Sequence, residues 1–296
     1  MPFLGELAAL LTAALWSVSA LVFAAASARA GSVQVNVTRL LLAVVYLAVL
    51  IPLLGADINL SGTQLLYLAI SGVIGLTLGD TFLFRAFQEI GARLSMLMMS
   101  LAPAIAAVIA YVFLGESLSV AGVVGIAVTL AGIALVVLGR QPSEDARYTL
   151  TGRGLAAALI GAAGQGVGLI FAKMAFNEGE VNGFVATFVR IVASLVPLLP
   201  MTMASGRLVT PWRFWKEDSR AAWLTALGSV IGPFLGISLS LIAVAHTKVG
   251  IAATIMATVP ILMLPLSHFV HRERLSWRAV GGAVVAVGGV GVLFLA

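Results

Sequence analysis

Long apolar segments limit the possible folds of this chain more than any other feature. Ten of them, of about 20 residues each, are separated by short polar breaks, at about 4–26, 33–54, 63–84, 93–113, 119–139, 153–174, 183–203, 221–243, 249–270 and 276–295. Such a segment crosses a bilayer as an α-helix, whereas strands of a membrane barrel are shorter and alternate in polarity. Only 10% of the 296 residues are charged, against about 25% in soluble domains. We expect an all-α membrane protein with ten transmembrane helices.

The second half of the chain repeats part of the first. Val-Ile-Gly-Leu-Thr-Leu-Gly (73–79) returns as Val-Ile-Gly-Pro-Phe-Leu-Gly (230–236), 157 positions later (230 − 73 = 157). The same spacing continues without a gap and places Pro103 on Pro260. A duplication of one ancestral half explains this pattern.

Five predicted spans fall in each half, which sets the domain organisation. We predict a first five-helix repeat over 1–139, a linker over 140–152 and a second repeat over 153–296. Because five is odd, the second repeat enters the membrane in the opposite sense, so the two repeats are inverted. Lys and Arg gather in the loops that follow odd-numbered spans. The positive-inside rule then predicts cytoplasmic odd loops and both termini outside, in a multi-pass protein of a bacterial cytoplasmic (inner) membrane.

Composition also excludes several classes of function. The chain has no cysteine, which excludes disulfides and thiol nucleophiles. Its net charge of +5 is typical of cytoplasmic loops that face anionic lipid, and we do not predict nucleic-acid binding. A phosphate-binding Gly-x-x-x-x-Gly-Lys-[Ser/Thr] loop is absent, so this chain does not hydrolyse ATP.

Metal and enzyme sites are not expected either. His268 and His271 are three residues apart, but no third ligand accompanies them, so we predict no metal and no cofactor. An aspartyl intramembrane protease needs two catalytic carboxylates, and Asp80 has no second acid deep in a span. A His-Glu-x-x-His zinc motif is also missing.

Prolines predict irregular places in three spans. Gly232-Pro233 lies inside the eighth span, and proline removes a helix hydrogen bond and clashes with the preceding turn. We therefore predict a kink or break there. Pro103 and Pro260 occupy matching positions within spans four and nine, which predicts a pair of equivalent kinks.

Several short motifs resemble a known transporter repeat. They are Leu-Gly-Glu-Ser-Leu-Ser (114–119) after a proline-containing span, Leu-Trp-Ser (15–17), Phe-Ala-Lys (171–173), and Arg39 with its counterpart Arg190. Together they are similar to the EamA repeat of the drug/metabolite transporter superfamily. The resemblance covers nearly the whole chain, in two copies.

This resemblance implies a ten-helix carrier, and many such proteins export amino acids or other small metabolites. It also implies a central cavity between the repeats, lined mainly by helices 1, 3, 4, 6, 8 and 9. Trp16-Ser17 in the first repeat stands where the second has Gly164-Gln165, so the two cavity walls should differ. Many relatives are interpreted with both termini in the cytoplasm, whereas the loop charges here favour the reverse.

Asp80 is the acid that lies deepest in a predicted span, and its counterpart in the second repeat is Ile237. A carboxylate in one of two matching walls suits asymmetric proton coupling. The alternative is an interfacial carboxylate paired with nearby Arg85. Arg85 and Glu89 are four residues apart, so they can also pair along one face of a helix.

Three basic residues and three polar or aromatic ones complete the candidate site. Arg39 and Arg190 each lie about seven residues into a span; in inverted repeats this depth predicts opposite faces and a structural or gating role. Lys173 can bind a substrate carboxylate or extend to the headgroups. The remaining candidates for the cavity wall offer hydrogen bonds or an aromatic surface: Trp16, Ser17 and Gln165.

The leading hypothesis is a secondary transporter that exports amino acids or related amphipathic metabolites by alternating access, with proton coupling through Asp80. Its partners are a small-molecule substrate and the lipid bilayer; nothing in the sequence predicts the oligomeric state. The alternative is a flippase for a lipid or a lipid-linked precursor. A channel is disfavoured because the sequence contains no ring of like charges and no filter motif.

Overall fold

Helices dominate the structure and the described residues contain no strand. The computed structural model describes residues 3–139, 151–204, 206, 210–263, 266 and 277–294. Within them, six helical spans are long and apolar enough to cross a membrane: Leu4–Ala30, Ser32–Leu53, Gly62–Gly91, Gly152–Asn177, Gly183–Ala204 and Ser219–His246. Shorter apolar helices lie in the other apolar segments, at Ala102–Leu114, Val120–Leu135, Val249–Met263 and Val280–Val292.

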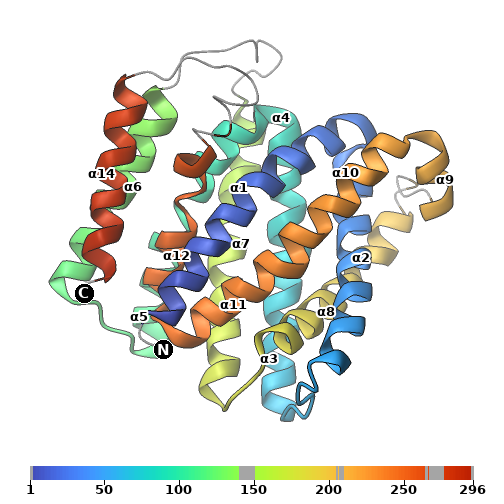
Figure 1. Ribbon diagram of the computed structural model, residues 1–296, viewed down its shortest axis with the longest axis horizontal. Helices are drawn as coiled ribbons and strands as arrows, with labels where there is room; N and C mark the ends of the chain where they lie inside the picture. Colours follow the sequence, from blue (N-terminus) through green and yellow to red (C-terminus); the bar gives the residue numbers. More distant parts are fainter. Residues whose placement is uncertain are drawn as a thin grey trace.

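The helices follow one another along the chain with short connections (Figure 1). In order they are α1 (Leu4–Ala30), α2 (Ser32–Leu53), α3 (Gly62–Gly72), η1 (Val73–Gly79), α4 (Asp80–Met99), α5 (Ala102–Leu114), α6 (Val120–Gly139), α7 (Gly152–Asn177), α8 (Gly183–Ala204), α9 (Pro211–Glu217), α10 (Ser219–Ser229), η2 (Val230–Gly236), α11 (Ile237–His246), α12 (Val249–Met256) and α14 (Trp277–Phe294).

Polar side chains cap several of the helix starts, including those of α3, α7 and α10. The Ser61 hydroxyl accepts from Gln64 N at 3.1 Å, and the Gln64 side chain accepts from Ser61 N at 2.9 Å, which makes a capping box at α3. Thr151 accepts from Gly154 N at 3.0 Å at the start of α7. Asp218 accepts from Ala221 N at 2.9 Å at the start of α10. Each cap satisfies a backbone donor that the helix leaves free.

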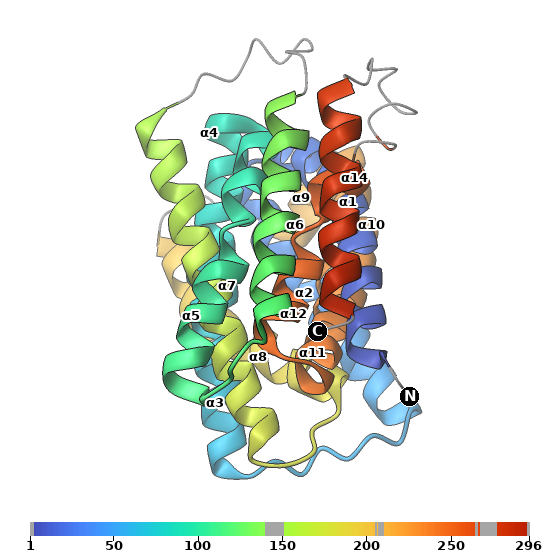
Figure 2. The ribbon, with the colours of Figure 1, turned by 90° about the vertical axis from the view of Figure 1, so that its left-hand side faces the viewer.

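The two halves run in opposite directions. In Figure 1, α1 leads away from the end of the bundle where the N-terminus lies, whereas α7 leads toward that end. The last helices of the two halves, α6 and α14, pack against each other at one side (Figures 1 and 2). A Cβ on Gly132 would collide with Ala286, and a Cβ on Gly289 would collide with Thr129. These are equivalent contacts, because Gly289 and Ala286 lie 157 positions after Gly132 and Thr129.

The repeated motif forms a π-helix in both halves. Residues 73–79 are η1 and residues 230–236 are η2, and the N–H groups of Asp80 and Ile237 bond to carbonyls five residues earlier. The helical path from α10 through η2 to α11 is continuous, so the structure accommodates Pro233 in a π-helix where the sequence predicts a kink or break. Because η1 has the same geometry without a proline, the proline is not its cause.

The helices that contain Pro103 and Pro260 are interrupted rather than kinked. A turn at Ser100 and Leu101 separates α4 from α5, and Pro103 lies in the first turn of α5. A turn at Ala257 and Thr258 likewise follows α12, and Pro260 lies in the helical segment 259–263 after it. Proline is tolerated at a helix start because its missing N–H would have no intrahelical partner there. The two interruptions are 157 positions apart, as the duplication requires.

The third predicted span is longer than the sequence suggested. It continues beyond residue 84 to Gly91, where a φ of 77° turns the chain. The extension carries Arg85 and Glu89, whose side chains pair at 2.8 Å as predicted. A hydropathy window detects the apolar part of a helix and misses a polar end of this kind.

Candidate functional site

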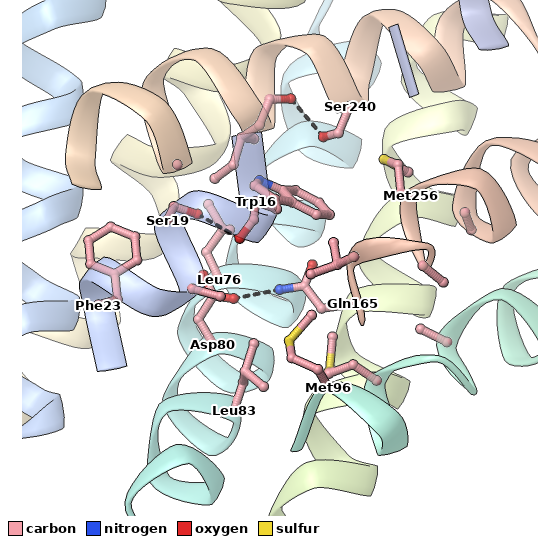
Figure 3. Close-up of a pocket in the computed structure, with 18 of the residues that line it drawn as sticks. Trp16, Ser19, Phe23, Leu76, Asp80, Leu83, Met96, Gln165, Ser240 and Met256 are labelled. Carbon is pink, nitrogen blue, oxygen red and sulfur yellow. Dashed lines mark hydrogen bonds between the residues drawn. The ribbon is translucent and has the colours of Figure 1, made fainter. Parts of the chain in front are cut away.

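A cavity of about 130 Å³ lies between the two halves (Figure 3). Residues of α1, η1, α4 and α5 line it from the first half, and residues of α7, η2, α11 and α12 line it from the second. From α2 and α8, the lining residues are Arg39 and Arg190. Most of the wall is apolar, and the charged residues that line it are Arg39, Asp80 and Arg190.

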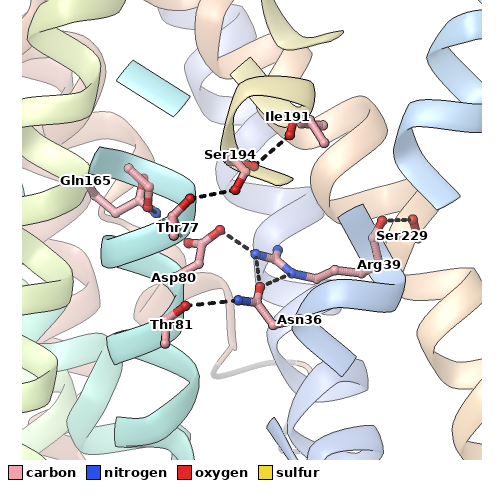
Figure 4. A network of polar contacts seen from close by, with 10 residues as sticks. Asn36, Arg39, Thr77, Asp80, Thr81, Gln165, Ile191, Ser194 and Ser229 are labelled. Carbon is pink, nitrogen blue, oxygen red and sulfur yellow. Dashed lines mark hydrogen bonds and ion pairs between the residues drawn. The ribbon is translucent and has the colours of Figure 1, made fainter. Parts of the chain in front are cut away.

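Asp80 is the acid of the cavity, and it begins α4 directly after η1. Its carboxylate forms an ion pair with Arg39 and accepts a hydrogen bond from Nη2 of that residue (Figure 4). It also accepts a 2.5 Å hydrogen bond from Nε2 of Gln165 (Figure 3). Gln165 also donates to the carbonyl of Gly75, inside η1, at 3.2 Å. The pair Asp80–Arg85 considered from the sequence does not form. Asp80 is 5% exposed, so these donors replace the water it would otherwise bind.

Arg39 is fixed by several contacts besides Asp80 (Figure 4). Its Nε and Nη2 donate to Oδ1 of Asn36 at 3.0 and 2.9 Å. Its guanidinium carbon lies 4.6 Å from the ring centre of Phe84 and 5.3 Å from that of Phe23, close enough for cation–π attraction. Its backbone carbonyl accepts from the hydroxyl of Ser229 at 2.6 Å. The first repeat therefore holds its arginine by an ion pair, hydrogen bonds to Asn36 and two aromatic contacts.

Arg190 lies at the same cavity with fewer partners. It is 1% exposed, and its Nε has no hydrogen-bond partner among the described residues. The charge of Asp80 attracts it, but the carboxylate makes its ion pair with Arg39. A Cβ on Gly75 would lie 3.0 Å from Nη2 of Arg190, which places the guanidinium against η1.

The prediction that Arg39 and Arg190 lie towards opposite faces is wrong for their charged groups. Seven residues of helix advance the Cα atom by about 10 Å, and half of the hydrocarbon core is about 15 Å. A long arginine side chain can cover the remaining distance from either side. Both guanidiniums therefore reach one cavity, although their helices enter from opposite ends.

The other sequence candidates divide into two groups. Trp16 and Gln165 line the cavity. Ser17 is not among the lining residues: its hydroxyl donates to the carbonyls of Ala13 at 2.6 Å and Val259 at 3.3 Å. Pro103 and Gly232 also line the cavity, whereas Pro233 and Pro260 are not among its lining residues.

Lys173 lies away from the cavity, in contacts at the end of the bundle where α1 begins. Its Nζ donates to the carbonyls of Val244 at 2.9 Å and Thr247 at 3.2 Å. The Thr247 hydroxyl donates to Glu6 at 2.9 Å, so the start of α1, the end of α7 and the end of α11 are joined. Glu116, from the 114–119 motif, accepts from Val249 N at 3.0 Å and attracts Lys173. These contacts connect the helix ends instead of presenting a free ammonium to a substrate.

Sequence reasoning missed the aromatic wall beside Asp80. Phe84 and Phe87 line the cavity together with Phe23, and the Phe84 ring lies 5.7 Å from that of Phe23 and 5.6 Å from that of Phe87. The signal was present, since positions 80, 84 and 87 share one face of an α-helix. His268 and His271 lie outside the described residues, among which no group of three possible metal ligands occurs.

The arrangement suits a small amphipathic molecule. An apolar and aromatic wall with a few polar groups at its centre is typical of sites for small molecules. Charged side chains inside a membrane are costly and occur where they pair or face a polar path. Here Arg39 and Asp80 form a neutral ion pair, and Arg190 is a second cation that lines the same cavity.

Comparison with known proteins agrees with this architecture. A sequence model of the EamA-like transporter family matches residues 3–138 and 152–295. The comparison with curated proteins gives no match. Among solved structures 29 chains match; one, described as "Crystal structure of protein", has a TM-score of 0.74 and 20% identity over 97% of this chain and 94% of that chain. At this identity the likeness concerns the fold alone.

Proposed function

This chain belongs to the EamA-like transporter family, and from that premise we propose that it is a secondary transporter for small amphipathic metabolites, amino acids among them. It exports them by alternating access through the cavity between its repeats. No phosphate-binding loop for ATP occurs in the sequence, so the driving force is an ion gradient or the substrate gradient itself.

The central charge cluster is the observation that carries this proposal. Arg39, Asp80 and Arg190 meet in a cavity to which both repeats contribute. Substrate and ion sites of inverted-repeat transporters lie near the middle of the membrane at the repeat interface. A purely structural bundle gains nothing from three ionisable groups at that place, because each costs free energy in the membrane.

The proposed topology has ten spans in two inverted repeats, over 1–139 and 153–296, with both termini outside. It rests on the loop charges and on the opposite directions of α1 and α7 (Figure 1). The chain has no cysteine, so single cysteines can be placed freely. We expect Asn59→Cys to react with an impermeant maleimide in whole cells and Arg213→Cys to react after the membrane is opened. Reaction of both from outside contradicts inverted repeats, and the reverse order contradicts the orientation.

Proton coupling through Asp80 completes the proposal. A cationic group of the substrate and a proton both bind best to a free carboxylate, so they compete for Asp80. Competition at one site links outward substrate movement to inward proton movement. The carboxylate accepts from two donors at present, out of about four acceptor positions, which leaves room for a substrate ammonium.

Transport measurements test this function directly. A metabolite-export screen of cells that overproduce the protein identifies the substrate, and proteoliposomes with an imposed pH gradient then measure its flux. We expect the gradient to accelerate wild-type transport and to have no effect on Asp80→Asn. Asp57→Asn, in the exposed loop between α2 and α3, is the matched control. Transport by Asp80→Asn that still follows the pH gradient excludes Asp80 as the coupling group.

Headgroup flipping in liposomes without transport of any water-soluble metabolite contradicts the proposed substrate class. Saturable flux that supports counterflow separates a carrier from a pore.

A further inference from the structure

Arg190 is a buried cation whose hydrogen-bonding capacity is not used. A guanidinium has five N–H donors and no acceptor. The Nε of Arg190 has no partner among the described residues, while the side chain is 1% exposed and lines the cavity. An unpaired buried charge is costly, so an anionic group that enters this cavity would be stabilised by Arg190.

The duplication shows which partner is missing. Asp80 is the first residue after η1, and Ile237 is the first residue after η2. In the first repeat, Arg39 pairs with the acid at that position. In the second repeat, the same position holds Ile237, which lines the cavity but cannot accept a hydrogen bond. Arg190 and Ile237 line the same cavity, and among the described residues the only charge that attracts Arg190 is Asp80 of the other repeat.

Two glycines of the first repeat fix where Arg190 lies. A Cβ on Gly72 would collide with the backbone of Arg190, and a Cβ on Gly75 would lie 3.0 Å from its Nη2. Small residues of this kind let helices approach closely within a membrane. The backbone of Arg190 therefore packs directly against α3, and its guanidinium lies beside Gly75 of η1.

We propose that Arg190 binds a carboxylate of the transported molecule, so that the substrate supplies to the second repeat the acid that Asp80 supplies to the first. The assignment rests on the proposed transport function and narrows its substrate class. An arginine fork matches the two oxygens of a carboxylate. An amino acid fits both walls, with its carboxylate on Arg190 and its ammonium at Asp80.

The charges of the cavity favour a carboxylate over a phosphate ester. Its lining holds Arg39, Arg190 and Asp80, which together leave one positive charge. One carboxylate group matches the single charge of Arg190, which is not taken up by the Arg39–Asp80 ion pair, whereas a phosphate monoester carries about −1.5 to −2. The volume of about 130 Å³ holds several waters, since one water needs about 10–15 Å³ on the same measure.

Matched acids and amides test the assignment even before the transported molecule is identified. The probes are N-acetyl-L-alanine, N-acetyl-L-leucine and N-acetyl-L-phenylalanine, each beside its amide, at equal ionic strength. They are added to the purified full chain in detergent, and its thermal unfolding is followed. We expect at least one acid to raise the unfolding temperature by about 2 °C at several times its Kd and its amide to bind about tenfold more weakly or worse.

Variants of Arg190 must remove this preference. Arg190→Gln should lose the difference between acid and amide, and Arg190→Lys should keep part of it because it keeps the charge but not the fork. Arg85→Gln, which lies outside the cavity, is the matched control and should behave as the wild type. Equal stabilisation by acids and amides in the wild type, or an acid preference that survives in Arg190→Gln, overturns the proposal.

A second variant leaves Arg190 intact and restores the missing acid. Ile237→Asp adds a carboxylate to the cavity that Arg190 also lines, and it should weaken acid binding about tenfold or more, with little effect on amides. Ile237→Asn changes the size in the same way without a charge and should keep the acid preference. Unchanged acid binding by Ile237→Asp contradicts the assignment. If the protein binds acids but transports no metabolite, the proposed transport function is wrong and the carboxylate site still stands. If it transports a metabolite equally well with and without a carboxylate, the carboxylate site is wrong and the transport function still stands.

Discussion

The third helix of each repeat contains the same seven-residue π-helix, but the residue after it is Asp80 in one repeat and Ile237 in the other. The backbone conformation is therefore the same in both repeats, whereas the carboxylate is present only in the first. In the first repeat, Arg39 is bonded to Asp80 and Asn36. In the second, Arg190 forms no ion pair with any residue that the structure describes. On the assignment proposed above, one of the two equivalent arginines stabilises Asp80 and the other binds the substrate.

The contacts behind the two arginines differ in the same way. Gly72 lets the backbone of Arg190 come so close that a Cβ there would collide with it. At the equivalent place in the second repeat, the hydroxyl of Ser229 donates to the carbonyl of Arg39 at 2.6 Å. The Gly72–Arg190 contact depends on the absence of a side chain, and the Ser229–Arg39 contact depends on a hydrogen bond. The two contacts should therefore respond differently to mutation.

The largest difference is expected between Arg39→Ala and Arg190→Ala. Arg39→Ala breaks a buried ion pair and leaves Asp80 without its cation, which costs about 3–5 kcal/mol of unfolding free energy. Arg190→Ala breaks no ion pair with a described residue and should cost clearly less. Chemical unfolding in detergent measures both. The double variant Arg39→Ala/Asp80→Ala should recover part of the loss, and equal losses for the two arginines would contradict the comparison.

A smaller difference is expected between Gly72→Ala and Ser229→Ala. Gly72→Ala forces α3 and α8 apart and should cost about 1–3 kcal/mol, as overpacking does. Ser229→Ala removes one hydrogen bond and should cost about 1 kcal/mol or less. The same unfolding assay ranks them. A greater cost for Ser229→Ala would mean that the hydrogen bond contributes more to stability than the close helix packing at Gly72.

Pro233→Leu makes the two π-helices more alike and should change little. Leu76 occupies the equivalent position in η1, which is π-helical without a proline, so we expect a change below about 1.5 kcal/mol in unfolding free energy. Transport of the identified substrate should also persist. A large loss of stability would show that the second π-helix depends on its proline, unlike the first.

The smallest effect concerns an ion pair that joins the repeats at the surface. The N–H of Ala221 and the nearby Arg29 lower the pKa of Asp218, so its stabilising effect is present at neutral pH and is lost as the pH falls through this lowered pKa. Asp218→Asn keeps a cap and removes the charge. The unfolding temperatures of the two proteins should differ at neutral pH and should converge as the pH falls below about 4. A constant gap would mean that the charge contributes nothing, as for many surface pairs.

Much of the fold could be predicted because it depends on patterns that the bilayer imposes. Apolar length located the helices, and the repeat at 73–79 and 230–236 located the duplication. The π-helices could not be predicted, since Gly75 and Gly79 indicate close packing and carry no signal for the hydrogen-bond pattern. What these glycines do indicate is close packing against a neighbouring helix, since a Cβ on Gly79 would lie 3.3 Å from Gln165 N in α7.

The site was predictable in part. Burial cost alone identified Asp80, Arg39 and Arg190 as unusual residues within spans. Their pairing was not predictable, because Arg85 is closer to Asp80 in sequence while α2 brings Arg39 to it in space. Ser17 was a weaker candidate because a serine in a membrane helix can donate its hydroxyl to the backbone carbonyl one turn earlier and then needs no partner in the cavity.

The two interruptions before Pro103 and Pro260 have a mechanical consequence. Each divides a helix that lines the cavity into two rigid rods joined by a turn. Such a joint can change its angle while the hydrogen bonds within each rod remain intact, so bending costs little. Because the joints occupy equivalent places in repeats of opposite direction, the same movement made in one repeat or the other acts on opposite ends of the cavity. In the proposed cycle, one inherited hinge thus serves as two gates.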